Sequence, residues 1–160
     1  MINTPFNLDR FSFNLGMINC FAEMVAVGVK RLAISPPLSP EEYEELREGS
    51  EAIVEGSGIH SYLETSLLVT DLQSAGFTRG KWSILYYKDQ ETLIAYLNLK
   101  ARSDTLEAAG THTSEVRREI SREFMRLLSY PEPVIKAKIQ DGGHSDPFIL
   151  DQPTSPRDSE

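Results

Sequence analysis

The chain has 160 residues, of which 40% are hydrophobic and 25% are charged, and its formal net charge is -8. This length and composition predict one globular domain and exclude a fibrous or largely disordered chain. The negative charge disfavours nucleic acid and anionic membranes as partners, because both are negatively charged themselves. The single cysteine excludes an internal disulfide bond and favours a reducing, cytoplasmic setting.

Residues 15–29 are the most apolar stretch near the N-terminus and resemble a membrane or export segment at first sight. The stretch is too short to cross a bilayer core of about 30 Å as a helix. An export signal also needs positive charge ahead of its apolar run, and here Asp9 and Arg10 cancel. We therefore predict a central core helix that follows an extended aromatic arm, begins at Asn14 as its N-cap and ends at Gly28.

A short apolar run at residues 29–34 stops at a pair of prolines, which is typical of a buried strand that enters a loop. The alternative is that the preceding helix continues into this run. Beyond the prolines, Ser39 and Glu42 have the spacing of a capping box, and Pro40 suits the first helical position. A second helix is therefore predicted from Pro40 to the Gly-Ser-Gly stop at residues 56–58.

Two further strands are predicted at residues 59–72 and 82–87, paired as an antiparallel hairpin. The second of them is the strongest strand signal in the chain, because aromatic and β-branched residues fill it without a breaker. The strand at residues 29–34 is expected to run parallel to the first strand of the hairpin, since a helix connects the two.

The C-terminal half is predicted to be mainly helical. One long helix follows residue 90, and a second, capped by Thr113 or Ser114, ends before Tyr130 and a proline. A short amphipathic helix is expected at residues 134–139.

These elements predict a single α+β domain over residues 1–140, with a small, mostly antiparallel sheet of about three strands covered by four or five helices. Residues 141–160 are rich in Asp, Pro, Ser and Gly, and only residues 148–150 carry large apolar side chains. Such a segment buries too little surface to offset its ordering entropy, so an acidic, disordered tail is predicted.

Two loops carry candidate binding residues. Ser35 and Ser39 lie where a strand is expected to lead into a helix N-terminus, a common anion-binding position, although a capped helix with nothing bound is the simpler interpretation. Arg79 and Lys81 lie in the hairpin loop, with Asp71 near the opposite strand end. Such a cation pair can bind an anionic ligand or an acidic partner. The alternative is an exposed turn with a screened salt bridge to Asp71.

The other polar residues indicate no catalytic or metal centre. The last long helix carries three arginines, each three residues after a glutamate: Arg118, Arg122 and Arg126 follow Glu115, Glu119 and Glu123. This spacing favours an ion-paired surface over a nucleic-acid site. The histidines His60, His112 and His144 have no ligand partners at metal-site spacing, and Cys20 is expected to be an inert core residue. With no nucleotide-binding or catalytic motif, neither a metal nor a cofactor is expected.

The sequence Leu-Leu-Ser-Tyr-Pro at residues 127–131 resembles a motif of certain uncharacterised prokaryotic proteins, in which a helix ends in Leu-Leu-Gly-Tyr-Pro followed by paired cysteines. Ser129 stands here in place of the glycine, and Pro133 and Val134 stand in place of the cysteines. The resemblance implies a prokaryotic conserved protein of unknown role, and no chemistry of those cysteines carries over.

For function, the absence of a concentrated catalytic constellation predicts a non-enzymatic binding or interaction module. Its abundant aromatic residues would suit a contact surface, for which a homodimer is one expected form. The alternative is a small-molecule enzyme or sensor with an anion site near Arg79 and Lys81. Binding of DNA or RNA ranks third, because of the net negative charge.

Overall fold

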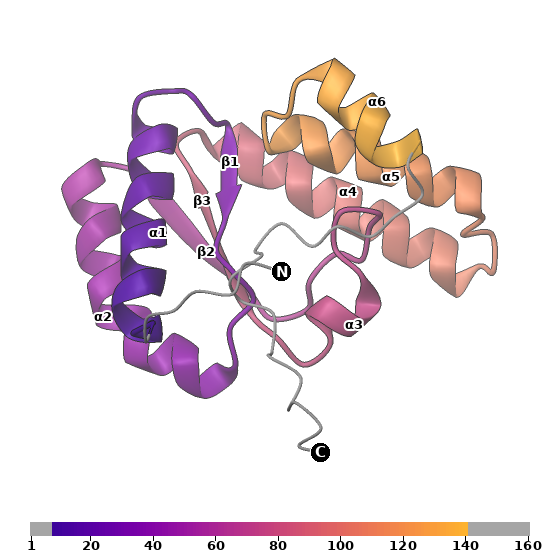
Figure 1. Ribbon diagram of the computed structural model, residues 1–160. Helices are drawn as coiled ribbons and strands as arrows, with labels where there is room; N and C mark the ends of the chain where they lie inside the picture. The colour runs from indigo at the N-terminus through magenta and orange to yellow at the C-terminus, as the bar shows by residue number, and fades with distance from the viewer. Residues whose placement is uncertain (1–7, 141–160) are drawn as a thin grey trace, which may run out of the picture.

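The structure is a computed structural model that describes residues 8–140. Its elements follow one another in the order α1 (Arg10–Ala26), β1 (Leu32–Ile34), α2 (Pro40–Ser57), β2 (His60–Glu64), α3 (Ala75–Thr78), β3 (Ser83–Tyr87), α4 (Gln90–Ala108), α5 (Ser114–Leu127) and α6 (Glu132–Gln140) (Figure 1). Six helices and one three-stranded antiparallel sheet in this range confirm the predicted α+β class. None of the helices between residues 8 and 140 has the length and apolar character needed to cross a membrane.

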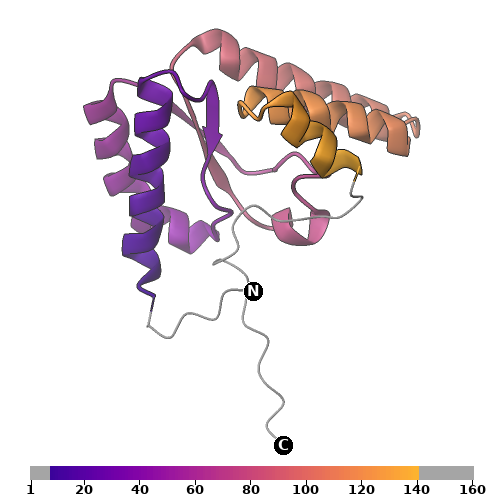
Figure 2. The same cartoon turned by 45° about the horizontal axis from the view of Figure 1, so that its top comes forward.

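The sheet lies between two layers of helices (Figure 2). Its middle strand, β3, pairs antiparallel with β1 on one side and with β2 on the other. Helices α1 and α2 cover one face, whereas α4, α5 and α6 cover the other. Strands β1 and β2 therefore run in the same direction, as predicted, but β3 separates them.

The middle strand is buried on both faces, which explains why its sequence shows no polar alternation. Leu85 and Tyr87 pack toward α4, α5 and α6, and Ile84 and Tyr86 pack toward α1 and α2. The Tyr86 hydroxyl lies 3.1 Å from that of Ser50 on α2, so its polar end is paired inside the core. Burial raises the pKa of Tyr86 well above its ordinary value.

Several helix ends confirm the local sequence signals. Ser39 and Glu42 form the predicted capping box, with each side chain accepting a hydrogen bond from the backbone nitrogen of the other. Gly28 and Gly58 follow α1 and α2 in the left-handed region, with φ of 80° and 65°. Thr113, one of the two predicted caps, accepts a hydrogen bond from the first turn of α5.

The first helix begins earlier than predicted, at Arg10 instead of Asn14. Asp9 accepts a hydrogen bond from the backbone nitrogen of Ser12 at 3.2 Å and so caps the helix one turn before the expected position. The residues from Arg10 to Phe13, predicted to be part of an extended arm, are therefore helical.

The same helix is not central, because only one of its sides is buried. Ile18, Ala22 and Val25 are buried against the sheet and α2, whereas Met24 and Val27 are exposed. The prediction that Cys20 is a core residue is wrong, since this cysteine lies on the exposed side.

Strand β2 ends at Glu64, well before the predicted end at residue 72. The Glu64 carboxylate accepts a hydrogen bond from the backbone nitrogen of Ser66 at 2.9 Å. Further along, the Thr70 hydroxyl accepts from the backbone nitrogens of Leu72 and Gln73. Such local side-chain bonds compete with strand pairing, and the chain forms a loop that contains the short helix α3.

The ion pairs of α5 also differ from the prediction. Arg126 pairs with Glu132 of α6, and Glu123 pairs with Arg102 of α4. These contacts join α5 to its neighbours, where pairs within the helix at three-residue spacing were expected. The predicted acidic tail at residues 141–160 lies outside the described residues, and so does His144.

Candidate ligand-binding site

Ser35 and Ser39 both make hydrogen bonds that serve the fold. The buried Ser35 hydroxyl accepts from the backbone nitrogen of Ile84 at 2.9 Å and donates to the carbonyl of Pro36 at 2.9 Å. The Ser39 hydroxyl caps α2. These contacts explain both serines as structural residues, because the Ser35 proton is already donated and the Ser39 oxygen already accepts.

Asp71 lies against α5 and pairs there with Arg117. The Arg117 Nε atom is 3.1 Å from Asp71 Oδ1, and the Asp71 backbone nitrogen donates to the Ser121 hydroxyl at 2.9 Å. The expected salt bridge from Asp71 to Arg79 or Lys81 is therefore replaced by a bond to α5.

Lys81 instead lies near the N-terminus of α2. The pKa of Glu41 is lowered mainly by hydrogen bonds to the Glu41 backbone nitrogen and to Ser39, and the positive charge of Lys81 lowers it further. The loop before α2 and the segment before β3 are held together by two backbone hydrogen bonds between Leu38 and Trp82, each 2.8 Å long. The structure thus brings Lys81 close to Ser39, whereas Arg79 is exposed at the end of α3.

A polar pocket of about 340 Å³ lies between the β2–α3 loop, α4 and α5. Beside it, the Glu64 carboxylate is 2% exposed and accepts hydrogen bonds from Tyr96 Oη at 2.9 Å and from Lys100 Nζ at 2.7 Å. Burial, and then the negative charge of Glu64, raise the pKa of Tyr96, so the phenol remains a donor. The buried carboxylate is therefore neutralised within the domain.

Three more polar side chains that line this pocket, those of Ser103, His112 and Arg117, have a polar neighbour within the fold. Ser103 Oγ and His112 Nε2 are 3.2 Å apart, and Arg117 faces Asp71. A serine–histidine pair acts as nucleophile and base only when a third group orients the histidine. No carboxylate between residues 8 and 140 hydrogen-bonds His112, and the same range holds no cluster of three potential metal ligands. The ion pairs of Glu64 with Lys100 and of Asp71 with Arg117 thus compensate charge beside this pocket, although Asp71 Oδ2 is buried without a hydrogen-bond partner within residues 8–140.

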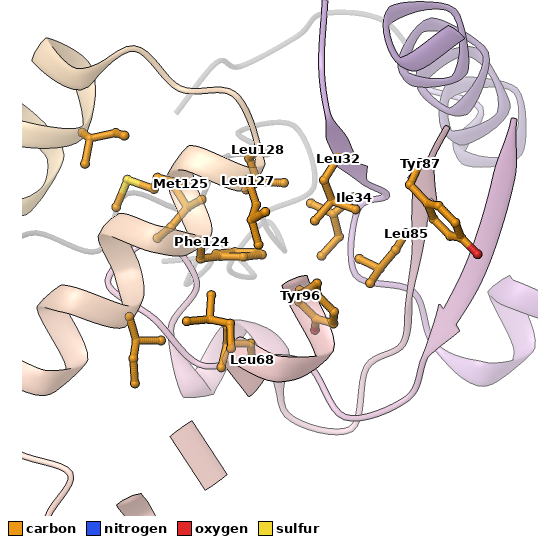
Figure 3. Packing of buried hydrophobic residues seen from close by; sticks show 14 of the residues in the cluster. Leu32, Ile34, Leu68, Leu85, Tyr87, Tyr96, Phe124, Met125, Leu127 and Leu128 are labelled. Carbon is orange, nitrogen blue, oxygen red and sulfur yellow. The ribbon is translucent and has the colours of Figure 1, made fainter. Parts of the chain in front are cut away.

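An apolar cavity of about 250 Å³ lies beside the edge strand β1. Its walls come from α1, β1, the β2–α3 loop and the turn after α5. The residues that line it are Phe21, Lys30, Ile34, Leu72, Gln73, Leu128 and Tyr130. Figure 3 shows two of its walls, with Leu128 of the turn facing Ile34 of β1. Both helical layers therefore contribute to this cavity.

Lys30 is the only charged residue among the described residues that line this cavity. Its ammonium donates to the Leu128 carbonyl at 2.6 Å and lies 5.5 Å from the centre of the Tyr130 ring. No carboxylate of residues 8–140 lies within 4.0 Å of it. Half-burial lowers the pKa of Lys30. A carbonyl dipole and an aromatic face thus stabilise this cation where an acidic partner is usual.

Gln73 supplies a second polar group to the cavity lining. Its side chain is buried, with 2% of the residue exposed, and its amide nitrogen has no hydrogen-bond partner within residues 8–140. A buried donor without an acceptor costs about 1–3 kcal/mol of stability. Because it borders a cavity, this donor is placed to bond a water molecule or a ligand.

Sequence reasoning missed these residues. Neither Lys30 nor Gln73 belongs to a sequence motif. The cavity depends on long-range contacts, such as those between Lys30 and Leu128 and between the Arg31 backbone and Ser129. No protein-family model, curated protein or solved structure matches the chain, so the geometry and chemistry of the molecule alone indicate its function.

Proposed function

We propose that this protein is a non-enzymatic binding module that holds a small organic molecule in the apolar cavity beside β1. The observation that carries the proposal is the combination of apolar walls with two polar groups: Lys30, which no carboxylate of residues 8–140 pairs with, and Gln73, whose amide nitrogen has no hydrogen-bond partner in that range. Ligand pockets in proteins are mainly apolar, with a few polar groups that fix orientation. A volume near 250 Å³ lies just below the usual range of about 300–1,000 Å³ and suits a compact ligand.

Binding without catalysis is supported by the chemistry of the cavity wall. Among the described residues that line it there is no histidine and no carboxylate, the side chains that most often transfer protons near neutral pH. The alternative, an anion-binding enzyme or sensor near Arg79 and Lys81, has less support. Lys81 already acts on Glu41, and Arg79 is exposed to solvent.

A cytoplasmic, prokaryotic setting and a homodimer remain predictions. The lone cysteine supports the first part, and the resemblance at residues 127–131 supports the second. The exposed apolar side chains of α1, Phe11, Met24 and Val27, support a contact surface on that helix. Sedimentation of the full chain tests the dimer, and a monomer at high micromolar concentration would rule it out.

The ligand site is tested by NMR of the full chain with compact organic molecules, such as short-chain and single-ring compounds. We expect saturable shifts at the amides of Lys30, Gln73 and Tyr130. Phe21→Trp, which adds a ring to the cavity wall, is expected to abolish them. Phe11→Trp is the matched control, because Phe11 lies on the same helix and is 46% exposed. Shifts that survive Phe21→Trp, or no saturable shift with any compound, would rule out the cavity as the site.

A further inference from the structure

We infer that the ligand of the apolar cavity is a compact monocarboxylate, whose charged end meets Lys30 and Gln73 and whose apolar body lies against the walls. This inference rests on the proposed function and adds the chemical class of the ligand to it. Three properties of the cavity lead to it: a cation without a carboxylate partner and a buried donor without an acceptor, both within residues 8–140, and a described wall that is otherwise apolar.

The first property is the charge of Lys30. An ammonium has three N–H donors, and the hydrogen bond to the Leu128 carbonyl uses one of them. The described part of the chain supplies no carboxylate to this cation, although the protein as a whole carries a net charge of -8. Within residues 8–140, this half-buried lysine therefore lacks the negative partner that would stabilise it most.

The second property is the amide nitrogen of Gln73. It can donate two hydrogen bonds and makes none within residues 8–140. A carboxylate only accepts, and its two oxygens can receive bonds from the ammonium and from the amide together. An amine ligand would repel Lys30, and an alcohol would leave its charge uncompensated.

The third property limits the charge and the size of the ligand. Phe21, Ile34, Leu72 and Leu128 present hydrocarbon surface, which favours an apolar body. Lys30 is the only cation among the lining residues, so one negative charge is matched and a second would be buried without a partner. A phosphate or a dicarboxylate therefore fits this wall less well than a monocarboxylate.

The protonation of Lys30 gives the inference a pH dependence. Half-burial lowers the pKa of Lys30 from its ordinary value of 10.5, so the lysine loses its charge at a lower pH than a solvated lysine. Carboxylate affinity is expected to fall as the pH rises through this lowered pKa, and the affinity for a neutral analogue is expected to stay constant.

The test is calorimetric titration of the full chain with matched pairs: benzoate against benzyl alcohol, and hexanoate against hexanol and hexylamine. Each acid is expected to bind at least about tenfold more tightly than its alcohol, the ratio that one charged hydrogen bond supplies. Lys30→Met is expected to remove this preference and leave the alcohol affinity unchanged. Lys88→Met is the control, because Lys88 also donates to a backbone carbonyl, that of Ala26, at an exposed position.

The outcomes separate the two proposals. Equal affinity for acid and alcohol, or an acid preference that persists in Lys30→Met, would overturn the carboxylate assignment and leave a binding module. Tighter binding of hexylamine would overturn it as well. If no compound binds, the proposed function itself is wrong. If Lys30→Met does not fold, the ratio of acid to alcohol affinity measured on the unmodified chain tests the carboxylate assignment by itself.

Discussion

Ser129 shows how one residue shapes the turn beside the cavity. Its φ of 65° lies in the left-handed region, and it is the one residue other than glycine between residues 8 and 140 with positive φ. This conformation costs an ordinary residue about 1–2 kcal/mol. The Ser129 hydroxyl offsets part of that cost by accepting a hydrogen bond from the backbone nitrogen of Arg31 at 2.9 Å, which ties the turn to the segment before β1.

Two substitutions at Ser129 are expected to separate the strain from the hydrogen bond. Ser129→Gly relieves the strain and loses the bond, so the free energy of unfolding should change by less than about 0.5 kcal/mol. Ser129→Ala keeps the strain and loses the bond, at a cost of about 1 kcal/mol. Urea denaturation measures both. An alanine variant as stable as the unmodified protein would show that the bond to Arg31 contributes nothing.

The buried ion pair of Glu64 and Lys100 allows a second prediction about the stability of single-residue variants. Lys100→Met leaves the Glu64 carboxylate, only 3% exposed at its side chain, without its cation, and should cost about 3 kcal/mol. Adding Glu64→Gln should recover most of this loss, because no buried charge then remains.

The control for this pair is Arg47→Met, which breaks the exposed pair of Arg47 and Glu44. Its cost should stay below about 0.5 kcal/mol, as for other surface pairs. Equal costs for Lys100→Met and Arg47→Met in urea denaturation would contradict the account of the buried pair.

Among the secondary-structure elements, those with strong local signals were predicted best. The helix after Ser39 has its cap, its proline and its terminal glycine within its own sequence, and β3 has an unbroken run of strand-forming residues. Strand β2 was predicted too long, because the Glu64 and Thr70 side chains accept hydrogen bonds from nearby backbone nitrogens, and the sequence pattern does not reveal these loop contacts. The start of α1 was predicted one turn too late, because both Asp9 and Asn14 are suitable N-cap residues and the structure uses Asp9.

The capping box of α2 allows a prediction about the contribution of helix ends to stability. Ser39→Ala removes the side-chain acceptor of the capping box and should cost about 1 kcal/mol of stability. Thr113→Ala, which removes the single cap bond of the exposed α5 start, should cost less, because no reciprocal side chain is involved there. Thermal unfolding followed by circular dichroism compares the two, and a neutral Ser39→Ala would contradict the structural role of this serine.

In the whole molecule, the cavity lies beside the edge strand β1 and is lined by residues from both helical layers. Strand β1 has only three residues, so Phe21 of α1 and Leu128, just after α5, can both line the cavity beside it. Lys30 comes into this space through a contact with a residue 98 positions further along the chain. Because such contacts appear only when the layers pack, the sequence predicted the class of fold but could not indicate this cavity, and its candidate sites were two local loops.

On our proposal, the polar groups of the cavity serve a ligand and not the fold. Thermal unfolding of Gln73→Leu distinguishes the two roles, because leucine has a similar size and no buried donor. We expect the midpoint to rise by about 3 °C, as removal of an unpaired donor worth about 1 kcal/mol implies, while carboxylate affinity falls. Gln90→Leu, at an exposed position, should change neither. A lower midpoint for Gln73→Leu would show that the amide stabilises the fold and would contradict the account.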